Sequence, residues 1–161
     1  DLQALVSGPS LQSRRIYQPS DRIYSENVHL ETTNDDWRRS NDKRQKMSKE
    51  LKTRTKEFAH RCVKLAIALP NTPLGNHIRG QLIRSSTSVA ANYRAACLAQ
   101  SKASFISKLS IVIEEADESY FWLEFIIDEN LLKNNLVGPL LKEADELTAI
   151  FIASRRTARK S

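Results

Sequence analysis

The strongest constraint on the fold is an apolar pattern that begins directly after Met47. Apolar or small residues recur at alternating steps of four and three, which places them on one face of a helix. This stripe comprises Leu51, Thr55, Phe58, Cys62, Leu65 and Leu69. Ser48 can cap the helix, and Pro70 followed by Asn71-Thr72-Pro73 ends it in a turn. The sequence therefore predicts an amphipathic helix from Ser48 to Leu69.

Three more helical patterns follow, over about 74–98, 101–129 and 137–153, with Ser101 as a cap and Asn134-Asn135 as a break. The predicted inner faces are, in order, Ile78, Leu82, Ser85, Val89, Tyr93 and Ala96; Phe105, Leu109, Val112, Ala116, Leu123 and Ile127; and Val137, Leu140, Leu141, Ala144, Leu147 and Phe151. Short connections and the absence of a strand pattern predict an all-α, antiparallel up-down four-helix bundle over residues 47–161.

Residues 1–46 differ from the rest, because their apolar residues follow neither a helical nor a strand period. Such a segment buries little surface, so we expect a poorly structured N-terminal extension. Met47 is the only methionine of the chain, and the helical pattern starts directly after it. We therefore expect Met47 to be the native start and 1–46 to be upstream sequence. The alternative is a genuine disordered, weakly basic arm.

Several classes of protein are disfavoured. No apolar run reaches about 18 residues, so we expect a cytoplasmic protein without membrane contact. Cys62 and Cys97 lack the spacing of a zinc site, and no Gly-rich phosphate loop is present. Glu114 and Glu118 share a helix face, but no histidine follows them as in di-iron bundles. We expect no catalytic residue, no metal and no cofactor, and hence no enzyme.

The third and fourth helices carry more apolar surface than one stripe, including Phe121, Trp122 and Ile152. Single exposed apolar residues are normal in soluble proteins. Larger exposed patches usually mark contacts between proteins, so we favour a homo-oligomer.

Charge is distributed unevenly along the chain. Residues 49–108 contain 11 Lys/Arg and 2 Glu, residues 109–146 contain 2 Lys and 10 Asp/Glu, and residues 155–160 add four positive charges. In one interpretation, the basic half binds the phosphates of a nucleic acid. In the other, the acidic third helix pairs with a basic helix of the same or a neighbouring subunit. The candidate nucleic-acid-binding residues are Arg79, Arg84, Arg94, Lys102 and Lys108.

A series of motifs in the bundle carries a family resemblance. They are Leu69-Pro70, Gln81-Leu82-Ile83-Arg84-Ser85-Ser86, Ser88-Val89-Ala90-Ala91-Asn92-Tyr93-Arg94, Ser101-Lys102, Phe105, Lys108-Leu109, Glu114-Glu115-Ala116-Asp117-Glu118 and Trp122-Leu123-Glu124. By their order and spacing, residues 47–161 resemble bacterial four-helix-bundle proteins first found encoded in intervening sequences of the large ribosomal RNA gene. Asn92-Tyr93-Arg94-Ala95-Ala96 stands where many members read Asn-Ile-Ala-Glu-Gly.

The resemblance implies a ring of bundles, typically a homopentamer, and it extends to an accessory protein of diversity-generating retroelements that associates with nucleic acid. Small side chains at Ser88, Ala90, Ala91 and Ala95 would let a neighbouring helix approach closely. We predict a non-catalytic, homo-oligomeric bundle that binds RNA or DNA, with structured RNA, such as ribosomal RNA, preferred. The alternative is a scaffold or accessory subunit that binds a protein partner and makes no direct nucleic-acid contact.

Overall fold

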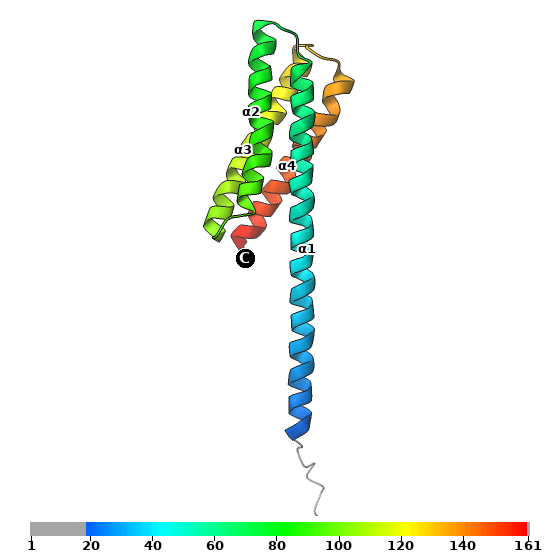
Figure 1. Cartoon of the computed structure of the whole chain (residues 1–161), viewed down its shortest axis with the longest axis vertical. Coiled ribbons are helices and arrows are strands. Elements are labelled where there is room, and N and C mark those ends of the chain that lie inside the picture. The colour runs from blue at the N-terminus through cyan, green and yellow to red at the C-terminus, as the bar shows by residue number, and fades with distance from the viewer. Residues whose placement is uncertain (1–18, 161) are drawn as a thin grey trace, which may run out of the picture. The chain divides into compact units, whose positions relative to one another are not determined.

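The computed structural model describes the backbone of residues 19–160, and the side chains from residue 38 onward except 40, 41 and 44. Within this range the regular elements are α1 (Pro19–Ile67), α2 (Pro73–Ala96), α3 (Lys102–Asp128) and α4 (Asn134–Lys160) (Figure 1). Internal contacts divide the chain into two units between Arg44 and Gln45. The description below concerns the second unit, which contains all the buried residues of the described range.

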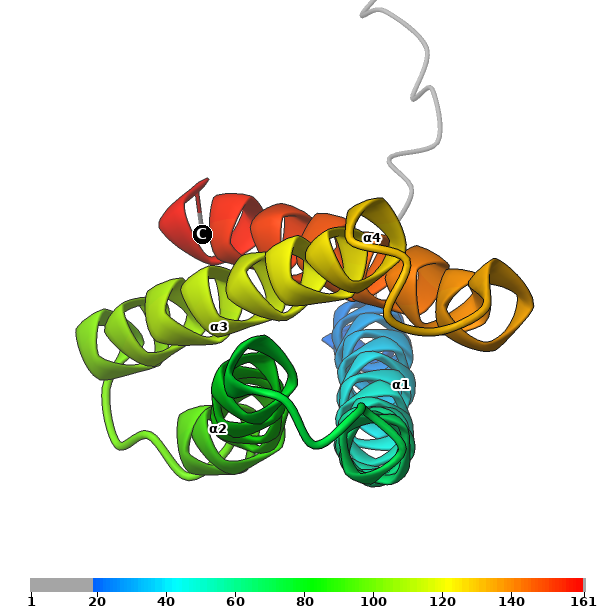
Figure 2. The ribbon, with the colours of Figure 1, turned by 90° about the horizontal axis from the view of Figure 1, so that it is seen from above.

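The second unit is an all-α, up-down four-helix bundle, which confirms the predicted fold class. Successive helices run in opposite directions, and α3 packs against both α2 and α4 (Figures 1 and 2). Side-chain bonds join α1 to its two neighbours. Arg79 of α2 donates to the carbonyl of Ala66 at the end of α1, and Arg54 of α1 donates to Glu143 of α4.

The first helix begins earlier than the sequence pattern indicates, at Pro19 rather than after Met47. Of the extension that was expected to be poorly structured, residues 1–18 lie outside the described range, and residues 19–46 are helical. Extending an existing helix adds one hydrogen bond for each residue fixed, whereas starting a new helix is costly. A helix that is anchored by Leu51 and Phe58 can therefore continue through residues that have no apolar period of their own. Whether the native protein starts at Met47 stays a prediction.

The predicted inner faces of α1 and α2 are confirmed, because every residue named for them is buried. Two differences occur in α3. Ile126 is fully buried where Ile127 was expected, and Phe105 is only half-buried. In α4, Leu141 is half-buried, while Val137, Leu140, Ala144, Leu147 and Phe151 are buried as predicted. The apolar surface of α3 exceeds one stripe, so periodicity alone does not decide which residues face the core.

The turn between α1 and α2 is tightly packed. Thr72 caps α2, accepting a hydrogen bond of 3.1 Å from the Gly75 amide, and Pro73 occupies the first helical turn. The Thr72 amide donates to the Pro70 carbonyl at 2.9 Å. A Cβ added to Gly75 would lie 2.1 Å from that same carbonyl oxygen. Glycine at position 75 is therefore what allows the chain to turn back this closely.

The other two connections use different local structures: a side-chain cap before α3 and a left-handed residue after it. Ser101 caps α3 as predicted, accepting a hydrogen bond from the Ser104 amide. After α3, Asn130 adopts a left-handed conformation with φ of 52°, and the Leu131 amide donates to the Ile126 carbonyl. Helix α4 then starts at Asn134, before the expected start at Val137.

Candidate nucleic-acid interface

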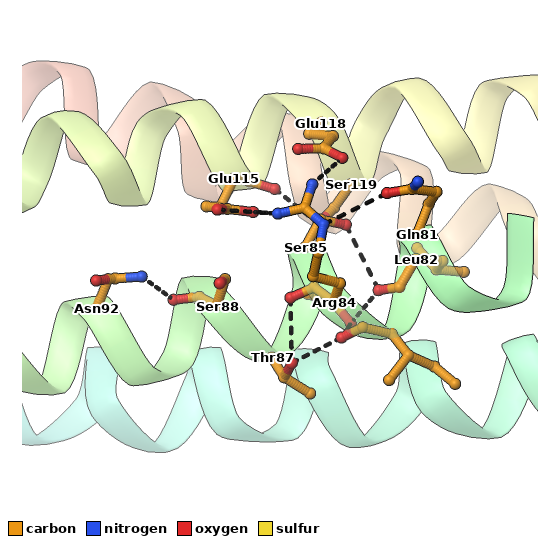
Figure 3. A network of polar contacts seen from close by, with 12 residues as sticks. Gln81, Leu82, Arg84, Ser85, Thr87, Ser88, Asn92, Glu115, Glu118 and Ser119 are labelled. Carbon is orange, nitrogen blue, oxygen red and sulfur yellow. Dashed lines mark hydrogen bonds and ion pairs between the residues drawn. The ribbon is translucent and has the colours of Figure 1, made fainter.

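Arg84, one of the predicted nucleic-acid-binding residues, is engaged within the bundle. Its guanidinium Nη1 donates to Glu115 at 3.3 Å, its Nη2 pairs with Glu118, and its Nε donates to Gln81 (Figure 3). Directly beneath, the buried hydroxyl of Ser119 donates to Ser85 Oγ at 2.9 Å. The basic second helix thus meets the acidic third helix within one subunit, as the structural interpretation of the charge pattern predicts.

Glu118 is also held by Trp122, whose indole Nε1 donates to Glu118 Oε1 at 3.2 Å. The hydrogen bond from Arg84 has the largest effect and lowers the pKa of the Glu118 carboxyl below its ordinary value. Burial opposes it, and the hydrogen bond from Trp122 adds a smaller lowering effect. A lowered folded-state pKa means that ionised Glu118 favours the folded state.

We expect this contribution to be fully present above the ordinary glutamate pKa of about 4.3 and to be lost as the pH falls through the lowered folded-state value. Replacing Glu118→Gln should therefore lower the melting temperature by a few degrees at neutral pH, because partly exposed ion pairs contribute little. At pH 2 to 3 the two proteins should melt together. Thermal melts followed by circular dichroism across this range would check it; a difference that persists at low pH would contradict it.

Arg79 also has a structural role. Its Nε donates to the Ala66 carbonyl at 3.1 Å and its Nη2 to the Leu69 carbonyl at 2.7 Å. Ala66 lies in the last turn of α1 and Leu69 just beyond it, where carbonyls lack the amide partners of a continuing helix. Its Nη1 donates to Asn76 of its own helix. Arg79 therefore ties the end of α1 to the start of α2, which the sequence pattern did not reveal.

The other three predicted residues lie toward the opposite end of the bundle. Arg94 is 15 residues beyond Arg79 on α2, about 22 Å along the helix axis. Lys102 opens α3 and Lys108 follows in its second turn. Arg94 and Lys102 are exposed and Lys108 is half-buried. Among the residues that the structure describes, none of the three forms an ion pair.

Contacts between helices identify which segments share this end. Ser48 Oγ lies 3.2 Å from Cys97 Sγ, joining α1 to the end of α2. The rings of Tyr93 and Phe151 pack with centroids 5.0 Å apart, joining α2 to α4. Arg155 of α4 donates to Ser110 of α3 at 3.1 Å. Segments 45–58, 89–112 and 147–160 therefore meet at one end of the bundle, which we call the basic end.

The two ends of the bundle differ sharply in charge. The basic end contains twelve Lys/Arg and two Glu, whereas the remaining segments, 59–88 and 113–146, contain six Lys/Arg and ten Asp/Glu. Each of the four helices contributes cations to the basic end. The C-terminal turns of α4 contribute Arg155, Arg156, Arg159 and Lys160. Sequence reasoning identified this C-terminal cluster, but only the antiparallel fold shows that it joins Lys102 and Lys108.

A groove of about 1090 Å³ runs between α1 and α2 on the outside of the bundle. Its lining combines small or apolar residues with charged ones: Lys52, Thr53, Lys56, Glu57, Ala59, His60, Val63, Thr87, Ala90, Ala91, Arg94 and Leu98. Ala90 and Ala91 belong to the small-residue run that was expected to admit a neighbouring helix. Leu98 at one end of the groove is 72% exposed.

The described residues offer little reactive chemistry. Burial, only partly offset by a hydrogen bond with Ser86, raises the pKa of the Cys62 thiol to about 12, so this thiol stays protonated at neutral pH. The three or more His, Cys, Asp or Glu side chains that would hold a metal ion do not gather anywhere in the described part of the chain. None of the helices between residues 19 and 160 carries an apolar stretch sufficient to cross a bilayer.

These features define a small helical bundle with a polar, ion-paired seam between α2 and α3 and a strongly basic end. Residues 47–153 match the model of the 23S rRNA-intervening sequence protein family, and the chain belongs to that family. A search of curated proteins found no match. The chain is similar in structure to a protein of unknown function of the S23 ribosomal protein family from Bacteroides thetaiotaomicron. The two share 35% sequence identity and a TM-score of 0.61, over 65% of this chain and 96% of that one.

Proposed function

We propose that this protein is a non-catalytic, cytoplasmic homo-oligomer that binds structured RNA through phosphate contacts made by its basic end. A pentamer is the assembly that the resemblance implies. The observation that supports the proposal most is the accumulation of twelve cations from all four helices at one end, where the same segments hold two glutamates and Arg54 alone among these cations pairs with Glu143 and Glu146. Lys and Arg on such a surface bind phosphates without reading sequence.

The structure changes which residues we propose as the interface. Arg79 and Arg84 already hold carbonyls and carboxylates of their own chain, and recruiting them to RNA would break those bonds. Lys102 and Lys108 have no such competitor among the described residues, and they are joined by exposed Arg156 and Arg159 of α4. These four residues form the core of the proposed phosphate-binding surface.

Repetition around an oligomer would multiply the effect of each weak patch. Once one subunit holds an RNA, the next patch binds it at a high local concentration, so a ring can bind tightly although each subunit binds weakly. The number of phosphates contacted then depends on the number of subunits, and so does the sensitivity of binding to salt.

The test is light scattering on the full chain, with and without a structured fragment of large-subunit ribosomal RNA, across a series of salt concentrations. We expect an oligomer that binds RNA, with an affinity that falls steeply as salt rises. Affinity that is independent of salt would contradict phosphate contacts.

A protein-binding scaffold is the second candidate, and exposed Phe121 and Ile152 on α3 and α4 favour it. An oligomer that ignores RNA at every salt concentration, but captures a protein partner, would replace the first proposal with this one.

A further inference from the structure

We propose that the groove between α1 and α2 receives the outer face of α3 from a second copy of this chain. The proposal rests on the homo-oligomer part of the proposed function and assigns the contact that would build it. The occupant is identified by three properties of the two surfaces: their shape, their charge and their length.

The groove is shaped to admit a helix. Ala59, Ala90 and Ala91 keep its walls low between α1 and α2, and Val63 and Leu98 add apolar surface. Side chains this small allow the ridge of a third helix to pack closely between two others. The rim is mainly basic: it carries Lys52, Lys56 and Arg94, with Glu57 as the acid among the lining residues.

The outer face of α3 has the complementary composition. The exposed positions of its central turns are Ile111, Glu114, Asp117, Phe121, Glu124 and Asp128. They follow one another at steps of three or four, so they form one continuous stripe. Four are acidic, and the other two, Ile111 and Phe121, are the exposed large apolar residues of α3, at 38% and 48% exposure. An acidic helix face with two apolar side chains is complementary to a groove with a basic rim and small, apolar lining residues.

The two surfaces also match in length. The groove follows α1 from Lys52 to Val63 and α2 from Thr87 to Leu98, each about 17 Å along the helix axis. The whole stripe from Ile111 to Asp128 covers about 26 Å, and its part from Ile111 to Glu124, which carries both apolar anchors, covers about 20 Å. The groove is lined by α1, α2 and Leu98 just beyond α2, whereas the stripe belongs to α3, so the two surfaces share no helix. Each copy can therefore donate a stripe and accept one at once, which is the head-to-tail arrangement that generates rings.

The first test fills the groove. Ala91 is exposed on the groove wall, so Ala91→Trp should leave the subunit folded and block an incoming helix. The matched control is Ala153→Trp, at an exposed alanine on α4. We expect light scattering to show the mass of Ala91→Trp falling from that of an oligomer to the 18.3 kDa of one chain, with its helical circular dichroism retained, while Ala153→Trp assembles normally. An Ala91→Trp protein that keeps the oligomer mass overturns the proposal.

The second test exchanges the charges and does not depend on groove volume. The variant Lys52→Glu/Lys56→Glu and the variant Glu114→Lys/Asp117→Lys should each lose self-assembly. Combining all four substitutions in one chain should restore it, because the groove and the stripe are again opposite in charge. A combined variant that stays monomeric while both parents are also monomeric and folded overturns the pairing of these two surfaces.

Measuring RNA binding on the same proteins separates this inference from the proposed function. A folded Ala91→Trp monomer that binds RNA more weakly, with a shallower dependence on salt, supports both. Assembly that responds as expected while no protein binds RNA supports the interface and removes RNA binding. An Ala91→Trp protein that remains oligomeric but loses RNA would make the groove a nucleic-acid site, and a monomeric wild-type chain would remove the interface and the oligomer together.

Discussion

Replacing Lys102, Lys108, Arg156 and Arg159 with glutamine should weaken RNA binding at low salt by more than about tenfold and flatten its dependence on salt. Each phosphate contact that is lost lowers the slope of log affinity against log salt by roughly 0.9, so four contacts lower it by about three to four. All four residues lie at the basic end and none forms an ion pair within the described range, so the fold should be unaffected. Filter binding or fluorescence anisotropy over a salt series measures both quantities.

The control changes the net charge equally at the other end of the bundle. Replacing the exposed cations Arg61, Lys64, Lys133 and Lys142 with glutamine removes the same number of positive charges. This protein should keep most of its affinity and nearly all of its slope. If both quadruple variants lose affinity to the same extent, then overall charge and not the basic end attracts RNA, and the assignment of the interface is wrong.

The second large effect concerns stability. Substituting Gly75→Ala should destabilise the bundle by about 1–3 kcal/mol, the usual range for overpacking. The added Cβ would lie 2.1 Å from the Pro70 carbonyl oxygen and 3.2 Å from the Thr72 hydroxyl that caps α2. Relief requires backbone movement in the turn that joins α1 to α2. Urea unfolding monitored by circular dichroism measures the free energy of unfolding.

The same substitution on the same helix supplies the comparison. Gly80 is exposed within α2, and a Cβ there meets nothing within 4 Å. Because glycine costs about 1 kcal/mol relative to alanine inside a helix, Gly80→Ala should stabilise the protein by up to that amount. Opposite signs at two glycines five residues apart would be hard to explain by helix propensity alone. Equal effects at both positions would show that the α1–α2 turn relaxes more easily than the packing at Gly75 indicates.

The sequence predicts most of this fold because the apolar stripes of α1 and α2 are narrow. Phe58, Cys62 and Leu82 have few alternatives for burial, and each is in the core. In α3, by contrast, Ile126 and Ile127 are equally apolar, and the packing of α2 and α4 on its two sides decides which one is buried. The helix over residues 19–46 was not predicted, because it continues from an anchored helix and carries no pattern of its own.

The candidate interface was predicted less completely, since a charge count cannot tell which cations are engaged within the chain. Arg84 and Arg94 look alike in the sequence, but only Arg84 lies opposite Glu115 and Glu118. For polar core residues too, the sequence does not reveal the partner, as Ser119 shows. It was not among the predicted inner-face residues, and its partner Ser85 is 34 positions away and becomes a neighbour only in the folded bundle.

The contact between α1 and α4 bears on how the chain leaves the ribosome. Arg54 pairs with Glu143 and Glu146, so two of the most distant parts of the bundle in sequence are joined by it. During synthesis, α1 emerges long before α4 exists to cover it. Until then Phe58 and Leu65 lack part of their final surroundings, and the nascent chain exposes an apolar helix face to solvent or to other nascent chains. The apolar face of α1 is therefore fully covered only after the last helix of the chain has been synthesised.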